Sequence, residues 1–252
     1  MDNNSWITNE DISTNMFVVT ASWVCFQFIL PSTVKLLYSN KTFYKQLNRD
    51  DKADFCHKTI ATIHAIISTV AALCVLASDE PSYEDAIWGK SLKGEMVGAF
   101  TLGYMIADLV MVCRQRADGY MLVHHSIFVL FYPILLLNSC MTHLILIRVL
   151  AEMSTPFVCM RWFLSVTGRA SSKMYFCNAV LLLSTFFVGR ILLMPYCYWR
   201  YFQTEGTAGY EKLGKIRLCF PTPVIMDCLN VYWFYRIVSG FAKYLRSHSK
   251  NK

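Results

Sequence analysis

The sequence contains few charged residues for its length. Of 252 residues, only 16% are Asp, Glu, Lys or Arg, against about 25% in a typical soluble domain. The charges occur in clusters, and between the clusters lie uncharged runs long enough to cross a bilayer, which takes about 20 apolar residues. This distribution excludes a soluble globular domain and a disordered chain. It predicts a polytopic membrane protein.

Several motifs of known chemistry are also absent. There is no Walker, Rossmann or GxSxG motif and no internal repeat. The six histidines include no HxxxH or HxxHH box, so the spacing of membrane di-iron enzymes is missing and we predict no metal site. No pattern indicates nucleic-acid binding. The net charge of +7 is explained instead by basic loops that favour an anionic cytoplasmic membrane surface.

The ten cysteines do not form a disulfide framework. None has CxxC spacing and most lie inside apolar runs, which is typical of small apolar residues in helices. Cys140, Cys197 and Cys219 fall near the predicted outer ends of their helices. These three are therefore the candidates for a single bridge.

Seven apolar runs predict seven transmembrane helices. Residues 119–147 carry no Asp, Glu, Lys or Arg and are too many for one crossing, so we divide them at the polar turn 138–142. Backbone groups in lipid must be satisfied internally, and no period-2 pattern favours a β-barrel, so we expect an all-α membrane protein. The predicted spans are 12–34, 59–78, 96–113, 120–137, 141–160, 174–199 and 218–235.

The Lys and Arg residues of alternate loops predict the orientation. Residues 40–58, the loops after the third and fifth spans, and the C-terminal tail are basic, whereas the N-terminus and the loop after the second span are poorer in Lys and Arg. The basic loop after the sixth span is the exception. The balance predicts an N-terminus outside or in the lumen and a C-terminus in the cytoplasm.

No basic region precedes the first span, which we interpret as an anchor helix and not as a cleaved signal. Of two glycosylation sequons, only Asn3-Asn4-Ser5 lies on the predicted outer side; Asn40-Lys41-Thr42 lies inside.

Ionisable residues at membrane depth are the main candidates for function, because a charge there costs several kcal/mol unless it is paired or solvated. A rise of about 1.5 Å per residue places His64, Asp108 and the doublet His124-His125 roughly 6–8 Å below the predicted cytoplasmic face. Arg148 and Glu152 are four residues apart and are expected to pair. Arg190 is the candidate partner of Asp227 or of an anionic lipid headgroup, and Pro156 is expected to kink the fifth span.

A carboxylate beside a histidine pair can fix a tautomer and raise the basicity of an imidazole, as general-base or nucleophilic catalysis requires. We therefore predict His124, His125 and Asp108 as catalytic residues in a pocket that opens toward the cytosol. The alternative for each polar residue is a hydrogen bond that only joins neighbouring helices. The predicted substrate-binding residues are His64, Arg148, Glu152, Arg190, Asp227 and Asn230.

The order of these residues resembles the TLC domain, which is shared by ceramide synthases, translocating-chain-associated membrane proteins and small TLC-domain proteins. The similarity covers roughly residues 40–243. It is carried by the segments Thr62-Ile63-His64-Ala65, Trp88-Gly89-Lys90-Ser91, Gly103-Tyr104-Met105-Ile106-Ala107-Asp108, Met121-Leu122-Val123-His124-His125, Arg148-Val149-Leu150-Ala151-Glu152, Val188-Gly189-Arg190-Ile191 and Asp227-Cys228-Leu229-Asn230.

The resemblance implies six helices around a cavity, with the first helix as an anchor outside it, in an internal membrane such as the endoplasmic reticulum. It divides the chain into residues 1–39 with the anchor helix, a TLC domain at 40–243, and a basic tail at 244–252. His124 and His125 match the paired histidines with which ceramide synthases transfer an acyl group from acyl-CoA. The Asp-rich stretch that follows in those enzymes is replaced here by Arg148, Glu152 and Ser154-Thr155-Pro156, which argues against ceramide synthesis itself.

Three functions remain open at this point. The first is a lipid-modifying enzyme that takes a membrane lipid or fatty-acyl substrate, with acyl-CoA as the candidate co-substrate and no other cofactor. The second is a non-catalytic lipid-binding or regulatory protein of the same fold. A transporter is the third, and the absence of paired discontinuous helices or duplicated halves disfavours it. The first two both predict a role in membrane lipid homeostasis.

Overall fold

The computed structural model describes residues 9–78, 85–115 and 118–249, and within these ranges it contains helices and no strands. The elements are α1 (Asn9–Val24), η1 (Cys25–Ile29), α2 (Leu30–Tyr38), α3 (Thr42–Gln46), α4 (Arg49–Ser78), α6 (Leu92–Arg114), α7 (Gly119–Leu137), α8 (Thr142–Val149), η2 (Leu150–Ser154), α9 (Thr155–Val166), α10 (Lys173–Phe186), η3 (Phe187–Leu192), α11 (Leu193–Phe202), α12 (Ala208–Lys212), η4 (Gly214–Cys219) and α13 (Pro221–Ser249). The all-α prediction is confirmed.

Six helical spans in the described residues are long and apolar enough to cross a membrane. They correspond to the first six predicted spans, and the predicted division of 119–147 is confirmed, because α7 ends at Leu137 and α8 begins at Thr142. The seventh predicted span is α13, which is not among those six. It has 29 residues, enough to cross a bilayer at about 1.5 Å per residue. It continues well beyond the predicted end at Tyr235.

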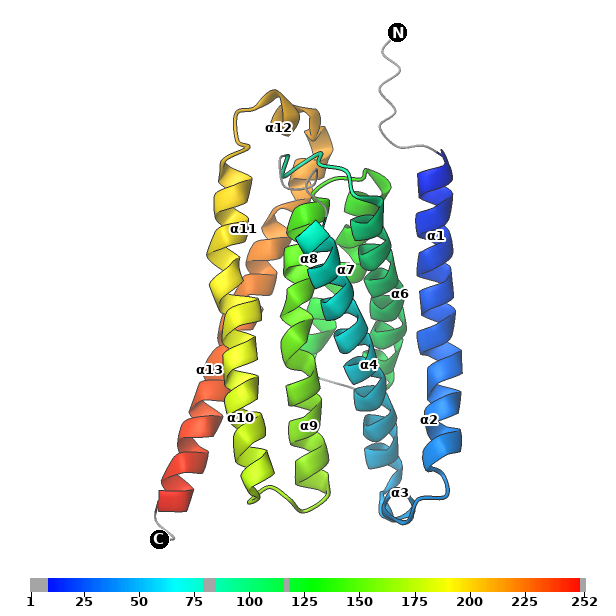
Figure 1. Cartoon of the computed structure of the whole chain (residues 1–252), viewed down its shortest axis with the longest axis vertical. Coiled ribbons are helices and arrows are strands. Elements are labelled where there is room, and N and C mark those ends of the chain that lie inside the picture. Colours follow the sequence, from blue (N-terminus) through cyan, green and yellow to red (C-terminus); the bar gives the residue numbers. More distant parts are fainter. Residues whose placement is uncertain (1–8, 79–84, 116–117, 250–252) are drawn as a thin grey trace.

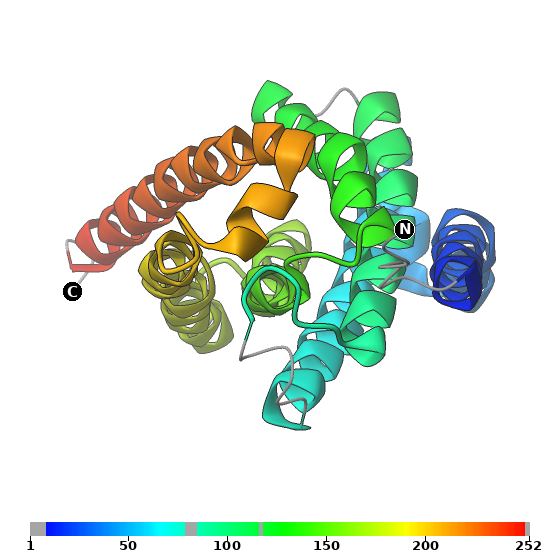
Figure 2. The ribbon, with the colours of Figure 1, turned by 90° about the horizontal axis from the view of Figure 1, so that it is seen from above.

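The long helices form a closed ring. Neighbours in contact around it are α4, α6, α7, α13, the α10–η3–α11 helix and the α8–η2–α9 helix, which returns to α4. The first span, α1–η1–α2, packs outside the ring against α6, and Figure 2 shows it at the edge of the bundle. This arrangement agrees with the expected anchor helix and six-helix ring.

The two ends of the bundle differ in the elements that close them (Figure 1). One end, called here the α12 end, carries the start of α1, the loop before α6, the turn between α7 and α8, and α12 with η4. The opposite end, called here the α3 end, carries α3, the loop between α9 and α10, and the C-terminal part of α13. The predicted orientation places the α3 end in the cytoplasm.

Three of the spans are not continuous α-helices: the first contains the π-helical segment η1, and the fifth and sixth are also interrupted. The predicted kink near Pro156 occurs one turn earlier, where η2 winds as a 3₁₀-helix and α9 starts with this proline in its first turn. The sixth span contains the π-helical segment η3. There Gly189 approaches the carbonyl oxygen of Leu150 so closely that a Cβ at this position would lie 2.8 Å from it. These irregular segments bring α8–η2 and η3 together.

All ten cysteines lie in the described residues and each is a free thiol. Cys140, Cys197 and Cys219 are buried near the α12 end. The expected bridge among these three is therefore wrong for this structure.

Candidate functional site

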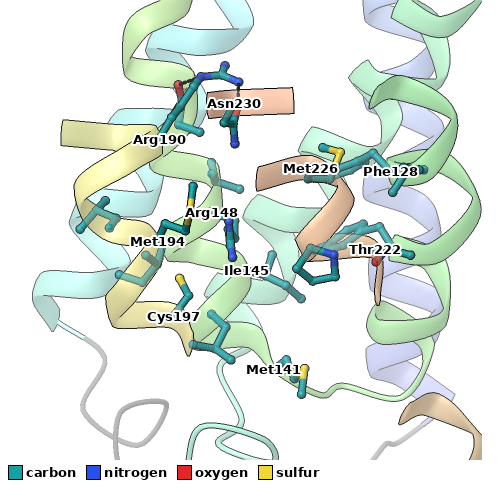
Figure 3. A pocket seen from close by; sticks show the side chains of 18 of the residues that line it. Phe128, Met141, Ile145, Arg148, Arg190, Met194, Cys197, Thr222, Met226 and Asn230 are labelled. Carbon is teal, nitrogen blue, oxygen red and sulfur yellow. Dashed lines mark hydrogen bonds between the residues drawn. The ribbon is translucent and has the colours of Figure 1, made fainter. Parts of the chain in front are cut away.

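A cavity of about 340 Å³ lies inside the ring between α7, α8–η2, η3–α11 and the first turns of α13. Most of its wall is apolar, with side chains such as Ile145, Leu144, Met194 and Phe128. Figure 3 shows Arg190 and Asn230 at one end of the hollow and Met141 and Cys197 at the other. The cavity is therefore amphiphilic: Arg190 and Asn230 lie at one end, and Arg148 and Thr222 lie farther along the otherwise apolar wall. A mostly apolar wall with a few polar groups is the usual composition of a small-molecule site.

The cavity occupies the middle of the bundle and the half toward the α12 end. On α13 its lining stops at Asn230, and on the α10–η3–α11 helix it begins at Gly189. Near the α12 end, Met141 and Tyr201 belong both to the cavity wall and to the buried cluster around Ile87 and Leu213. With the predicted orientation, the hollow extends toward the outer half of the bundle, whereas the sequence predicts an opening toward the cytosol. Toward the α3 end, Phe55 and Ile60 of α4 and Cys159 of α9 belong to one buried cluster.

His124 is the predicted catalytic residue that reaches the cavity. It lies on α7, is 9% exposed, and its Nδ1 atom is buried without a hydrogen-bond partner in the structure. Its ring packs edge-on against Trp233 of α13, with the centroids 5.3 Å apart. Packing fixes the ring, while no carboxylate within the described residues forms an ion pair with it. The orientation of the His124 ring is thus fixed, and the imidazole is not used in an ion pair within the described residues.

Asp108 contacts His125 and not His124. Its Oδ2 lies 3.2 Å from Nε2 of His125, without the angle of a hydrogen bond. Its Oδ1 accepts a hydrogen bond from Nε2 of His57, a residue of α4. The predicted His–Asp contact is therefore confirmed for one member of the doublet. Because adjacent residues of a helix point about 100° apart, the doublet is divided between the cavity and this carboxylate.

His57 is a polar residue that the sequence analysis missed. Its Nδ1 lies 3.1 Å from Oε1 of Gln115, and its side chain is 15% exposed, so it joins Asp108 to the α3 end of the bundle. The predicted second span begins at residue 59, whereas α4 begins at Arg49. The signal was available, since His57 precedes His64 by seven residues and thus lies on nearly the same helix face.

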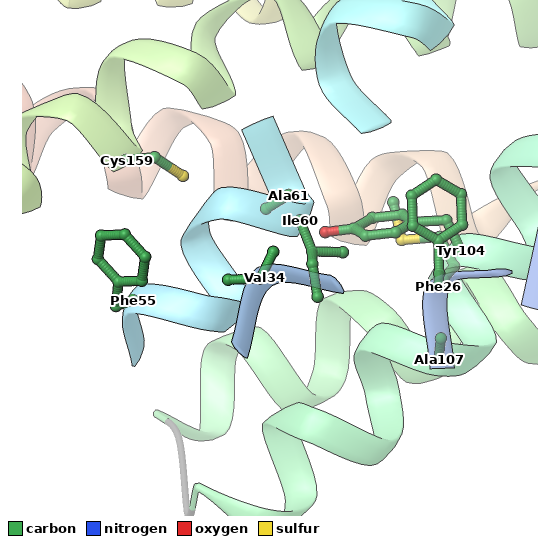
Figure 4. Close-up of a cluster of buried hydrophobic side chains, with 9 residues drawn as sticks. Phe26, Val34, Phe55, Ile60, Ala61, Tyr104, Ala107 and Cys159 are labelled. Carbon is green, nitrogen blue, oxygen red and sulfur yellow. The ribbon is translucent and has the colours of Figure 1, made fainter. Parts of the chain in front are cut away.

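His64 has a structural environment that the prediction did not anticipate. It is fully buried, its ring stacks on Tyr104 at 3.8 Å between centroids, and both ring nitrogens lack hydrogen-bond partners in the structure. Phe26 of the outer helix packs edge-on against it (Figure 4 shows Phe26 beside Tyr104). His64 does not line the large cavity. Its predicted role in substrate binding has no geometric support.

Two arginines line the cavity, and neither has the predicted partner. Arg148 pairs with Asp227 of α13 through both terminal nitrogens, one at 2.9 Å. Arg190 lies 3.6 Å from Glu152. The expected Arg148–Glu152 and Arg190–Asp227 pairs are therefore wrong. The 3₁₀ turn of η2 explains the first, because it rotates Glu152 away from the α-helical position that would face Arg148.

Neighbouring polar groups complete both ion pairs. The Tyr198 hydroxyl donates a hydrogen bond to Asp227 at 2.7 Å. Arg190 donates from Nε to the Ala151 carbonyl at 3.1 Å and from a terminal nitrogen to Oδ1 of Asn230 at 3.1 Å. Thr155 donates to Glu152 at 2.9 Å. The predicted residues Arg148, Glu152, Arg190 and Asn230 thus meet at one cavity with His124, and Asp227 meets it through Arg148.

The described residues contain no group of three or more His, Cys, Asp or Glu side chains placed to hold a metal ion. The site consists of an apolar wall, one imidazole, two ion pairs and an amide. Such an arrangement can bind an amphiphile and hydrogen-bond its polar end. A His–Asp–His chain lies directly behind His124, whose ring is 5.2 Å from that of His125.

Comparison with known proteins agrees with this architecture. The model of the TLC domain matches residues 54–239. TLC domain-containing protein 4-A of Xenopus laevis is 32% identical over 96% of this chain and 97% of its own length. The human TLC domain-containing protein 4 is 28% identical over 83% of this chain and 81% of its own length, and a Dictyostelium discoideum protein named TLC domain-containing protein 4 A is 24% identical over 96% and 94%. No solved structure matches. The chain therefore belongs to the TLC domain family and is an integral membrane protein.

Proposed function

We propose that this protein holds the acyl chain of a membrane lipid inside the helical ring and acts in membrane lipid homeostasis, in an internal membrane such as the endoplasmic reticulum. The observation that carries the proposal is the apolar cavity with its polar end. An acyl chain would lie against side chains such as Ile145 and Met194. The polar end of the lipid would lie among His124, Arg190 and Asn230.

Photochemical labelling tests this proposal. Cells that express the protein are fed a palmitic acid with a diazirine and an alkyne, which they incorporate into many lipid classes, and are then irradiated. We expect crosslinks on the cavity-lining segments of α7, α11 and α13, mapped by mass spectrometry. Met194→Trp, which fills the cavity, is expected to reduce this labelling at least fivefold.

Leu192→Trp is the matched control, because Leu192 lies two residues away and is 55% exposed on the outside of the bundle. It adds the same indole without filling the cavity and is expected to label like the wild type. Labelling restricted to outward-facing residues, and equal in both variants, would show that the cavity holds no acyl chain.

Acyl transfer is the second candidate function, and the position of the His124 imidazole in the cavity wall favours it. In this reaction a hydroxyl or amine of the acceptor lipid attacks the thioester carbonyl of acyl-CoA. His124 removes the proton of the nucleophile, and the thiol of CoA leaves with a proton. His125, held beside Asp108, supports the neighbouring ring by packing. The general base would contribute about 10²–10⁴-fold to the rate.

A lipidomic comparison separates the two candidates. Cells lacking the protein are complemented with the wild type, His124→Ala, His125→Ala or Asp108→Asn at matched expression. Catalysis predicts that His124→Ala leaves the lipid profile at that of the null cells, and that Asp108→Asn, which keeps the shape and removes the charge, restores it only in part. Full restoration by both His variants would reject catalysis and leave lipid binding.

The proposed orientation, with the N-terminus in the lumen, has a simple test. The sequon at Asn3 lies outside the described residues, and Asn40 lies between α2 and α3 at the α3 end of the bundle. We expect a glycan that an endoglycosidase removes, and its loss in Asn3→Gln but not in Asn40→Gln. A glycan at Asn40 would reverse the orientation.

A further inference from the structure

We infer that the polar end of the bound lipid is uncharged, so that the ligand is a neutral lipid with an ester, amide or hydroxyl end and not a fatty acid or a phospholipid. This inference rests on the proposed function and names its ligand class. It follows from the charges that line the cavity.

The first charged group in the wall is already neutralised. Both terminal nitrogens of Arg148 face the two carboxylate oxygens of Asp227. Asp227 is 4% exposed and also accepts the hydrogen bond from Tyr198. An anionic headgroup at Arg148 would therefore have to compete with a buried carboxylate that is held from two sides.

The second charged group also has a carboxylate beside it. Arg190 lies 3.6 Å from Glu152, and its side chain is only 9% exposed. Its Nε donates to the Ala151 carbonyl and lies 3.2 Å from the Ser154 hydroxyl, while a terminal nitrogen donates to Asn230. The charge of Arg190 is therefore offset within the protein, and two of its five N–H groups already donate to protein oxygens.

The cavity wall therefore offers two balanced ion pairs and no unpaired arginine. Among the described residues, the Asp, Glu, Lys or Arg side chains that line the cavity are Arg148, Arg190 and Glu152. Asp227 pairs with Arg148 and brings the net charge of this group to zero. Bringing an anion into this region removes its hydration without an unpaired positive charge to replace it, which is unfavourable. A neutral end requires only hydrogen bonds, for which the His124 imidazole and the Asn230 amide lie in the cavity wall.

The test uses the purified full-length protein in detergent and ligands that share one oleoyl chain. A diazirine-bearing 1-oleoylglycerol is the labelled probe, and the competitors are 1-oleoylglycerol, oleate and 1-oleoyl-lysophosphatidate at neutral pH. We expect 1-oleoylglycerol to displace the probe at a concentration at least tenfold below either anion. Equal or stronger competition by an anion would overturn the inference while leaving a lipid-binding cavity. No cavity labelling with any oleoyl ligand would overturn the proposed function as well.

Removing one carboxylate tests whether the ion pairs cause the preference for a neutral ligand. Glu152→Gln leaves Arg190 without its negative partner, so oleate should gain at least tenfold in competition relative to 1-oleoylglycerol. Asp227→Asn should do the same through Arg148, which keeps the test available if one variant does not fold. Glu211→Gln is the matched control, because Glu211 pairs with Arg217 on the exposed α12 end. An unchanged preference in the folded variants would show that these pairs do not select the ligand.

Discussion

The two sides of the bundle are built from similarly apolar sequences but pack differently. Where α1, α4 and α6 meet, the interior is solid: Ala65, Ala72 and Ala99 have no exposed surface, and aromatic rings surround His64. Figure 4 shows Phe26 and Val34 of the first span, Ile60 of α4 and Tyr104 of α6 in this cluster. Between α7, α8, α11 and α13 the interior is hollow.

The difference follows from the residues at the helix contacts. On the solid side, Gly103 lets α1 approach so closely that a Cβ would lie 2.4 Å from the Val19 carbonyl oxygen, and Ser22 donates to the Phe100 carbonyl at 2.6 Å. In a bilayer, helices associate through such close packing and through hydrogen bonds, because lipid is as apolar as the side chains. The hollow side has irregular backbone in η2 and η3, and ion pairs join its helices across the gap.

Breaking the ion pair of the hollow side is expected to have the largest effect. Asp227→Ala leaves the half-buried Arg148 charged and unpaired, and we expect a cost toward the lower end of the about 3–5 kcal/mol that breaking a buried pair entails. We expect a correspondingly lower thermal midpoint, measured by size-exclusion chromatography of heated, detergent-solubilised protein. The double variant Arg148→Met, Asp227→Leu removes both charges and should recover most of the loss. A single variant as stable as the wild type would show that the pair does not hold α8 to α13.

Overfilling the solid side should have a smaller effect. Gly103→Ala places a methyl group against the α1 backbone and is expected to cost about 1–3 kcal/mol. The same heating assay measures it. Gly240→Ala, at a helix position with nothing within 4 Å, is the control and should change stability by less than about 1 kcal/mol. Equal stability of the two variants would contradict the close packing of α1 on α6.

The smallest effect is expected at His64. Because both ring nitrogens are buried without partners, His64→Phe removes an unsatisfied polar group from an aromatic cluster, and we expect stabilisation by about 1 kcal/mol. The lipid profile of complemented cells should match that of the wild type. If a folded His64→Phe protein fails to restore the lipid profile, His64 has a functional role. The side of the bundle where α1, α4 and α6 meet would then not be purely structural.

Particular residues show how far the sequence predicted the site. His124, Arg148, Glu152, Arg190 and Asn230 were identified because polar groups at membrane depth are costly, and all five line the cavity. The pairing of the charges was predicted wrongly, because the i, i+4 rule assumes a regular helix and η2 is not one. His57 and Glu95 were missed because each lies just outside a span defined by hydropathy alone. Glu95 is nevertheless 1% exposed and accepts a hydrogen bond from Asn15 of α1 at 2.8 Å.

The sequence by itself determined the class of the protein, the number of long helices and most of the residues that need partners inside a membrane, because hydropathy and the cost of buried charge are local properties of the chain. The tertiary structure alone decided which histidine faces the cavity, which carboxylate neutralises which arginine, and in which half of the bundle the hollow lies. These depend on helix rotation and on the 3₁₀ and π segments, where a change in winding moves a side chain to another face without any change in composition.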